Sequence, residues 1–230
     1  MKLEVYFGGT ERPNTLHTLA RAGGKRIILS YAEPPTYSCW KIIREYGFEV
    51  LLDSGAYSAW KRGRSISLDD YMDYIREHHI TQYFNLDVVG NPEDTAVNQA
   101  TMEAAGLSPI PVFHYNEPWE LLELLIAKYA LVGLGGTVGL PYRDKVYWLE
   151  QVYSRHPEGR FHALGITSER ILTQFPFTQV DSTWWVFKNR EKVKRLAPGK
   201  DRKEEQEARV RHLMALEKES GKGYQLALGF

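Results

Sequence analysis

LLDSGAYSAW, residues 51–60, is the stretch that decides the fold, because an apolar run ends there in an aspartate and then breaks into small residues. The apolar run predicts the buried end of a strand, and Asp53 stands where that strand stops. The small residues 54–56 let the backbone turn sharply. In sheets of parallel strands the carboxyl ends form the functional site, so an acid at this place indicates chemistry. Capping of the following turn or helix by the Asp53 side chain is the alternative, and both stay open at this point.

The composition fits one globular domain. The chain has 230 residues, 43% of them hydrophobic, and its mean hydropathy is -0.41. No apolar run approaches the roughly 20 residues that a membrane span needs, and the N-terminal MKLEVYFGG lacks the apolar region of a signal peptide. Cys39 is the single cysteine, which excludes an internal disulfide and a multi-cysteine zinc site. We therefore expect a cytoplasmic protein with no membrane partner.

Charge is balanced over the whole chain but not along it. Lys plus Arg and Asp plus Glu both number 29, whereas the segment 188–203 carries eight basic and two acidic residues, a net of 8 minus 2, or +6. Clustered basic residues favour binding to the phosphates of a nucleic acid, and a solvated helix face is the alternative. The residues that we expect to contact nucleic acid are Lys188, Arg190, Lys192, Lys194 and Arg195.

Short apolar segments alternate with amphipathic helical ones along the chain. The expected strands are residues 3–9, 26–31, 49–55, 82–90, 109–115, 130–136, 160–166 and 179–185. The expected helices are residues 14–22, 37–47, 67–79, 92–106, 117–130, 143–153, a short one near 169, and a last one at 203–218.

Eight strand–helix units in series predict an α/β protein with the (β/α)8 architecture of a TIM barrel. A doubly wound open sheet is the rival, and it is disfavoured because no GxGxxG follows the first strand. We expect the barrel to occupy residues 1–186. Residues 187–230 then form a C-terminal basic helical segment that packs on the barrel or extends it.

The strand ends of such a barrel share one mouth. Several carboxylates in a small cleft repel one another and raise each other's pKa, an arrangement that is costly unless it is used. Two chemistries stay open: a divalent metal site built from carboxylates and a histidine, or metal-free double displacement at a sugar carbon. The lack of an HxH after the first strand and of an HExxH disfavours the metal. The expected mouth residues are Gly8, Gly9, Tyr31, Asp53, Asp87, His114, Gly135, Gly136, Gly165 and Asp181.

Four short motifs resemble those of a known family, in the family's order. DSGAYS (53–58), GLGG (133–136), HALGI (162–166) and VDSTWW (180–185) resemble motifs of the tRNA-guanine transglycosylases, over about residues 49 to 185. DSTWW in particular is similar to the phage and bacterial relatives that place 7-deazaguanines in DNA. The resemblance implies a pentosyltransferase that exchanges guanine in a nucleic acid, DNA more than tRNA, for a free 7-deazaguanine base. It implies a covalent aspartyl-glycosyl intermediate and neither cofactor nor metal.

The resemblance also implies a role for each matching residue. Asp181 would attack the anomeric carbon, and Asp53 would handle the proton of the base. Asp87 would accept hydrogen bonds from the N–H groups of the base. The family's cysteine-rich zinc site cannot form from one cysteine, which disfavours tRNA as the substrate. The other substrate-binding residues would be Ser54, His114, Gly135, Gly136 and Gly165.

Alternatives stay open for function and for assembly. The same barrel would suit a metal-dependent hydrolase, or a non-catalytic nucleic-acid-binding subunit of a transglycosylase complex. The protein would act alone, as a homodimer or with a partner subunit. Trp184 and Trp185 either stack on a base or sugar or pack in the core.

Overall fold

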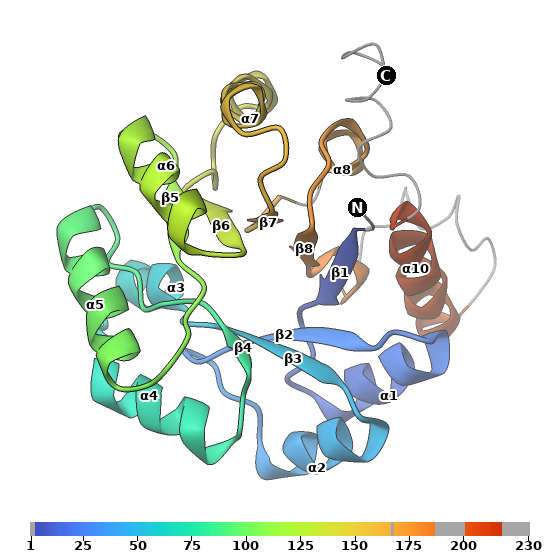
Figure 1. The fold of residues 1–230 in the computed structure, drawn as a ribbon. Coiled ribbons are helices and arrows are strands. Elements are labelled where there is room, and N and C mark those ends of the chain that lie inside the picture. Colours follow the sequence, from blue (N-terminus) through green and yellow to red (C-terminus); the bar gives the residue numbers. More distant parts are fainter. Residues whose placement is uncertain (1–2, 167, 187–200, 218–230) are drawn as a thin grey trace.

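Eight parallel strands curl into a barrel in the computed structural model, which describes residues 3–166, 168–186 and 201–217. The order around the sheet is β4-β3-β2-β1-β8-β7-β6-β5, as the (β/α)8 topology requires, so the predicted TIM barrel is confirmed (Figure 1). The strands are β1 (Glu4–Phe7), β2 (Arg26–Ser30), β3 (Glu49–Asp53), β4 (Gln82–Tyr83), β5 (Val112–His114), β6 (Val132–Gly135), β7 (Phe161–Ala163) and β8 (Gln179–Ser182).

The seam between β4 and β5 is the weakest part of the ring. One isolated parallel bridge, between Phe84 and Ile110, joins the two sides. The Ile110 N–H donates to the Tyr83 carbonyl at 2.8 Å, and the Asn85 N–H donates to the Ile110 carbonyl at 2.9 Å. Prolines 109 and 111 flank Ile110 and have no N–H to donate, so the ladder stops there. The strand expected at 82–90 is therefore shorter than predicted, and the chain after it is free to enter the mouth.

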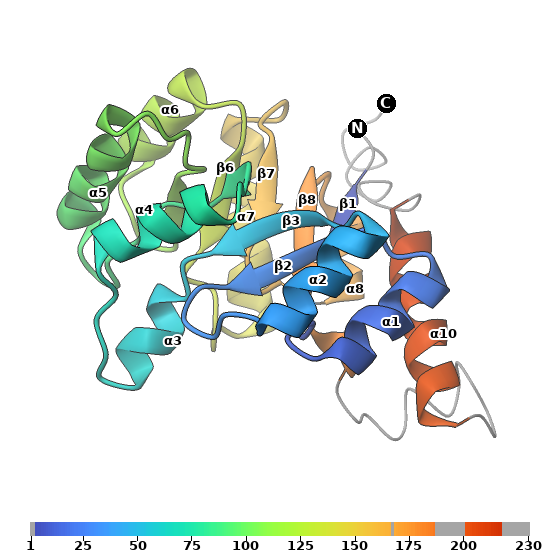
Figure 2. The same ribbon diagram turned by 90° about the horizontal axis from the view of Figure 1, so that it is seen from below.

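Helices surround the barrel in both views (Figures 1 and 2). Two boundary signals are confirmed: the Ser67 side chain caps α4 by accepting the Asp70 N–H, and Gly47 ends α2 with φ +63°. The short helix α3 was not expected, because six residues are too few to show a periodicity. The helices are α1 (Pro13–Ala22), α2 (Tyr37–Tyr46), α3 (Ala56–Lys61), α4 (Leu68–Glu77), α5 (Pro92–Ala104), α6 (Trp119–Lys128), α7 (Tyr142–Arg155), α8 (Glu169–Gln174), the 3-10 turn η1 (Trp184–Val186) and α10 (Arg202–Leu216).

The apolar core has two parts. The larger lies between the sheet and the helices, and a small one, of Tyr6, Ile28, Leu51, Phe84 and Val112, is separate from it. These five residues come from five strands or strand ends, and they alternate with residues that face the helices. Because the interior is packed rather than hollow, a ligand can enter only above this layer, at an end of the barrel.

The last described helix packs beside the first. In Figure 1 α10 lies against α1, where Arg21 and Glu207 form an ion pair at 3.0 Å. The expected boundary at residue 186 and the basic residues Lys188, Arg190, Lys192, Lys194 and Arg195 adjoin or fall in 187–200, outside the described residues, so the predictions made for them stay predictions. Among the described residues no helix is long and apolar enough to cross a membrane.

Candidate active site

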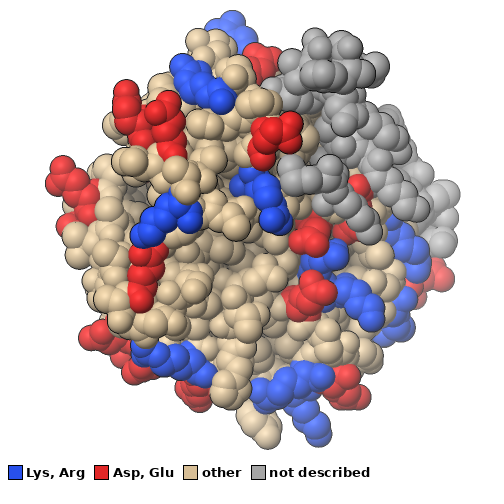
Figure 3. Space-filling view, viewed as in Figure 1, with Lys and Arg blue, Asp and Glu red and all other residues tan. Residues whose placement is uncertain are grey.

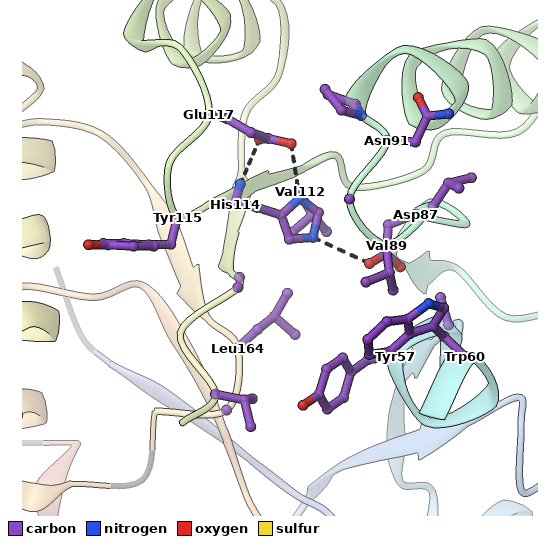
Figure 4. A pocket seen from close by; sticks show the side chains of 18 of the residues that line it. Tyr57, Trp60, Asp87, Val89, Asn91, Val112, His114, Tyr115, Glu117 and Leu164 are labelled. Carbon is purple, nitrogen blue, oxygen red and sulfur yellow. Dashed lines mark hydrogen bonds and ion pairs between the residues drawn. The ribbon is translucent and has the colours of Figure 1, made fainter. Parts of the chain in front are cut away.

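A cavity of about 780 Å³ opens where the strands end. Its acidic lining comes from the end of β3, the loop after β4, the turn after β5, and β8: Asp53, Asp87, Glu117 and Asp181. His114 at the end of β5 lies between Asp87 and Glu117, as Figure 4 shows. The parallel strands thus bring together side chains that are up to 128 positions apart in the sequence, 53 to 181.

Asp53 both holds the following turn and lines the cavity, so the two roles that the sequence left open are not exclusive. Its carboxylate accepts hydrogen bonds from the backbone N–H groups of Ser54 and Gly55, so it fixes the turn before α3. It also lines the cavity. Burial, and then the charges of Asp87 and Asp181, raise the pKa of Asp53 to about 7, because each makes the ionised form less stable. A carboxyl group with this pKa can both donate and accept a proton near neutral pH.

Asp87 sits in a network of side chains. The Ser54 hydroxyl donates to its Oδ1 at 3.0 Å, and His114 Nε2 lies 3.3 Å from its Oδ2. Glu117 holds His114 from behind, at 3.2 Å from Nδ1 and 2.7 Å from the backbone N–H (Figure 4). Burial lowers the pKa of His114, but Asp87 and Glu117 together outweigh it and raise that pKa to about 9. The histidine is therefore a cation between two carboxylates at neutral pH.

Asp181 is held from the opposite side of the barrel. The Gly165 N–H donates to its Oδ1 at 3.1 Å, and His162 Nε2 lies 3.4 Å from the same oxygen. Gly165 has φ +67°, a conformation that favours glycine and that brings its N–H into the mouth. His162 is fully buried beneath the cavity.

Gly135 makes room for the histidine of the site. A Cβ at this position would lie 2.9 Å from Val112 Cγ1 and 3.0 Å from His114 Cδ2. Since both distances are below ordinary contact, any larger residue would push His114 away from Asp87. The missing side chain at Gly135 therefore makes room for the protein's own His114, and Gly136 lies next to Gly135 in the lining.

The rim of the cavity is apolar on one side. Tyr57 and Trp60 of α3 stack with ring centroids 6.1 Å apart and planes 29° apart, and 57% of Trp60 is exposed. Figure 4 shows the pair side by side, with Leu164 across the cavity from it. Exposed aromatic residues at the mouth of a cavity offer a flat surface to a ligand. Sequence reasoning missed both residues because it did not detect α3.

The other expected mouth residues do not line this cavity. Gly8, Gly9 and Tyr31 are absent from its lining, and a Cβ on Gly9 would meet Val186 Cγ2 at 2.6 Å, so that glycine accommodates η1. Ser54 is fully buried and is not part of the lining, and its hydroxyl donates to Asp87. Trp185 is also fully buried and donates its indole N–H to the Gly8 carbonyl at 2.8 Å, which agrees with packing rather than stacking on a ligand.

Besides Tyr57 and Trp60, sequence analysis did not single out Glu117, His162 and Asn91 at the site. Glu117 follows His114 by three positions, a spacing that could have suggested a contact, but only the turn after β5 places it behind the ring. His162 lies inside the HALGI motif. Successive strand residues point to opposite faces, so the alternation of His162 with Ala163 could have indicated that the histidine faces the barrel interior. Among the described residues no group of three His, Cys, Asp or Glu side chains is arranged to hold a metal ion.

On the face of the molecule seen in Figure 3, the described residues form no field of a single sign. On this face the described Lys and Arg side chains alternate with Asp and Glu around a largely uncharged middle. Mixed charge of this kind does not favour the phosphates of a nucleic acid over other ligands.

Comparison with solved structures supports the fold and changes the expected relationship. A 4-hydroxy-2-oxoglutarate aldolase/2-deydro-3-deoxyphosphogluconate aldolase from TTHB1 matches with a TM-score of 0.57 and 16% identity, over 93% of this chain and 92% of its own. Tryptophan synthase subunit alpha from Legionella pneumophila str. Paris matches with 0.56 and 13%, over 94% and 92%. TrpF from Jonesia denitrificans matches with 0.50 and 13%, over 93% and 98%. No family model and no curated protein matches the sequence.

The expected membership of the tRNA-guanine transglycosylase-like superfamily is wrong, because the structural matches are aldolase, tryptophan synthase alpha and TrpF barrels. Base exchange between a nucleic acid and a 7-deazaguanine, with Asp181 as nucleophile, falls with it. These matches lend no support to the hydrolase and nucleic-acid-binding alternatives. The motifs misled because they mark strand ends and tight turns, which barrels share whatever their chemistry. At this level of identity the matches show the fold alone: this chain is a (β/α)8 barrel with an acidic cavity at the carboxyl ends of its strands.

Proposed function

We propose that this protein is an enzyme that transfers protons on a small organic substrate, with Asp53 as the general acid and base. The observation that carries the proposal is a cavity-lining carboxyl group whose pKa is raised to about 7 by burial and by two neighbouring aspartates. General acid–base catalysis is most effective when the pKa of the group lies near the working pH. Titratable groups with strongly perturbed pKa values cluster at functional sites, where burial and neighbouring charges shift them.

The charge of the lining selects the substrate. Asp53, Asp87, Glu117 and Asp181 line the cavity, and the described lining contains neither Lys nor Arg. A phosphate or carboxylate would be repelled here and would find no cationic partner except His114, which two carboxylates already hold. The substrate is therefore uncharged or cationic, and rich in hydroxyl or N–H donors that the carboxylates can accept.

The reaction class follows from what the lining offers. Without a lysine in the described lining, a Schiff-base route has no nucleophile there. Acid–base chemistry beside a hydroxyl or carbonyl group needs only a proton acceptor and a group that holds the oxygen. The names of the structural matches include an aldolase and a tryptophan synthase subunit, and reactions of the lyase or isomerase type suit the same kind of barrel mouth. The phosphorylated compound in the aldolase's name does not suit this acidic lining.

The cavity divides the work between its two sides. Asp53 exchanges the proton, while Asp87, held by Ser54 and His114, accepts a hydrogen bond from the substrate and fixes its orientation. Asp181 stays near enough to influence the pKa of Asp53. Tyr57 and Trp60 cover an apolar or flat part of the substrate at the rim.

Hydrogen exchange in heavy water tests the proposal, because it detects proton transfer to and from carbon whatever the product is. The protein is incubated in D2O with a panel of uncharged ketoses, hydroxyketones and amino polyols, each beside its phosphorylated counterpart. NMR then follows loss of carbon-bound hydrogen. We expect exchange in at least one uncharged or cationic compound and none in its phosphorylated form.

Asp53→Asn should slow the exchange by roughly 10²–10⁴-fold, the usual contribution of a general acid or base. Asp69→Asn is the matched control, because Asp69 is exposed in the first turn of α4, away from the cavity. Exchange confined to phosphorylated compounds, or undiminished in Asp53→Asn, would contradict the proposal.

A further inference from the structure

A fully buried histidine stands directly behind one of the aspartates of the site. His162 on β7 is 0% exposed. Its Nε2 lies 3.4 Å from Asp181 Oδ1, and its Nδ1 lies 3.3 Å from Gln179 Oε1. The ring thus faces a side-chain oxygen on each side, and the position of its protons depends on which of these two groups accepts a hydrogen bond from it.

The amide of Gln179 is fixed by its other contacts. Its Nε2 donates to Glu4 Oε2 at 3.2 Å, and a carboxylate can only accept. Glu4 also lies 3.6 Å from Arg26, at the end of the barrel opposite the cavity. Gln179 must therefore turn Oε1 toward His162, which makes this oxygen an acceptor and Nδ1 the donor.

A proton on Nδ1 determines what happens at Nε2. In a neutral ring with Nδ1–H, Nε2 would present a lone pair to the Asp181 carboxylate, which would be repulsive at the observed distance. The contact is attractive only if one further proton lies between Nε2 and Oδ1. The same Oδ1 accepts the Gly165 N–H, so the carboxylate group cannot turn this oxygen away without losing that bond.

We propose that His162 is a positioning residue that shares an additional proton with Asp181, holding this carboxylate in place and offsetting its charge. The proposal rests on the proposed function, because it gives Asp181 its place in that reaction. The pair carries one proton more than a carboxylate beside a neutral histidine, and this proton is taken up from the solvent. Asp181 becomes a weaker source of repulsion for Asp53 than a bare carboxylate would be.

The surroundings keep this proton inside the barrel. Phe84 meets the His162 ring edge-on with centroids 5.0 Å apart, and Tyr6 lies at 6.2 Å. Burial, and then the charge of Glu4, raise the pKa of Tyr6 to about 12, so it stays neutral. Of the two hydrogen-bond partners of His162, Asp181 is the one that lines the cavity. The shared proton can therefore reach the substrate side only through Asp181.

Nitrogen NMR of the imidazole rings tests the proposal independently of any activity. The full chain is labelled with ¹⁵N-histidine, and one- and two-bond couplings report which ring nitrogens carry protons. The spectrum is recorded near neutrality, at about pH 7.5, where we expect protons on both nitrogens of His162. The exposed His79 gives a reference signal in the same sample. A bare Nε2 or a bare Nδ1 on His162 in the unmodified protein would overturn the proposal.

Two variants at Gln179 sharpen the test. Gln179→Met removes the acceptor at Nδ1, so the ring is expected to become neutral and to keep its proton on Nε2, facing Asp181. Gln179→Glu combined with Glu4→Gln keeps an acceptor at Nδ1 and a donor–acceptor contact between residues 4 and 179, so it should preserve both protons. Should Gln179→Met not fold, the spectra of the unmodified protein and of this double variant still decide the question, since two protons are expected in each.

Kinetics separate positioning from general support of the fold. In the exchange assay, His162→Gln should lower kcat about 10-fold or more with KM little changed, as for loss of a hydrogen bond to a charged group that matters in the transition state. It should also shift the pH profile, which a merely structural residue would leave in place. An unchanged kcat and profile would contradict the role. If no compound in the panel exchanges, the proposed function fails, whereas the nitrogen spectrum still decides where the proton lies.

Discussion

Two aspartate–histidine pairs face each other across the cavity, and they differ in what stands behind the histidine. His114 is backed by Glu117, a carboxylate, and 23% of its side chain is exposed, whereas His162 is backed by the amide of Gln179 and is fully buried. The first pair is a cation held by two anions. The second shares one proton in an apolar interior. The comparison teaches that an acceptor behind each ring, a carboxylate at His114 and an amide oxygen at His162, leaves the other ring nitrogen to face the aspartate.

Asp53 lies between the two pairs and has no histidine among its described partners. The aspartates of both pairs, Asp87 and Asp181, raise its pKa. The folded-state pKa is raised from 3.8 to about 7, and the stability that the protonated group provides is therefore lost as the pH rises between these values. Asp53→Asn should stabilise the protein relative to the unmodified chain above pH 7, by about 4 kcal/mol at most, from 1.36 kcal/mol per pKa unit. Urea denaturation between pH 4 and pH 8 measures the difference.

Asp69→Asn is the control for that series, and its curve should run parallel to that of the unmodified protein. If the Asp53→Asn curve were parallel as well, the pKa of Asp53 would not be raised, and the two pairs would not act on it.

The next largest effect concerns His114. Its folded-state pKa is raised from 6.5 to about 9, so the stability it contributes is fully present below pH 6.5 and is lost as the pH rises through 9. By the same conversion this amounts to about 3 kcal/mol at most. His114→Gln should remove the loss of stability between pH 6.5 and 9, as measured by denaturation at fixed temperature. If the unmodified protein shows no such loss, Glu117 does not hold the ring as a cation.

Two glycines offer a matched substitution on the two sides. Gly136 and Gly165 have φ +72° and +67°, so alanine should cost about 1–2 kcal/mol at each by backbone strain alone. A Cβ at Gly136 would also lie 2.9 Å from the Tyr115 nitrogen, whereas at Gly165 the nearest atom is Val138 Cγ2 at 3.5 Å. Gly136→Ala should therefore lower the free energy of unfolding more than Gly165→Ala. Equal losses of unfolding free energy would show that the backbone beside His114 accommodates a Cβ as easily as the backbone beside Asp181.

The smallest effect is expected at Ser54. Its hydroxyl donates to Asp87 at 3.0 Å and accepts the Ala56 N–H at 3.2 Å. Ser54→Ala should cost about 1 kcal/mol, the net value of an ordinary hydrogen bond. Thermal denaturation of this variant beside His114→Gln would rank the two partners of Asp87. A larger loss in Ser54→Ala would mean that the hydroxyl, rather than the histidine, holds the carboxylate.

Periodicity predicted the barrel well because each strand and helix carries its own apolar pattern, and the ends of α2 and α4 carry their own stop and cap residues. For the same reason Asp53 and Asp181 could be placed at strand ends, whereas Asp87 lies in the loop after β4, beyond the end of that short strand. The resemblance to a family failed because GLGG and HALGI describe turns of the backbone, which unrelated barrels share. Glu117 and Trp60 were missed because they lie on a turn and on a six-residue helix that leave no repeating pattern.

The sequence by itself therefore determined the (β/α)8 topology and the strand ends at which the carboxylates stand, since both follow from local patterns of apolar and small residues. Only the tertiary structure decided which groups are partners: Glu117 behind His114, Gln179 and Asp181 on either side of His162, and Asp53 between the two pairs. The physical reason is that a pKa depends on burial and on charges a few ångströms away, and closure of the barrel is what brings those groups together.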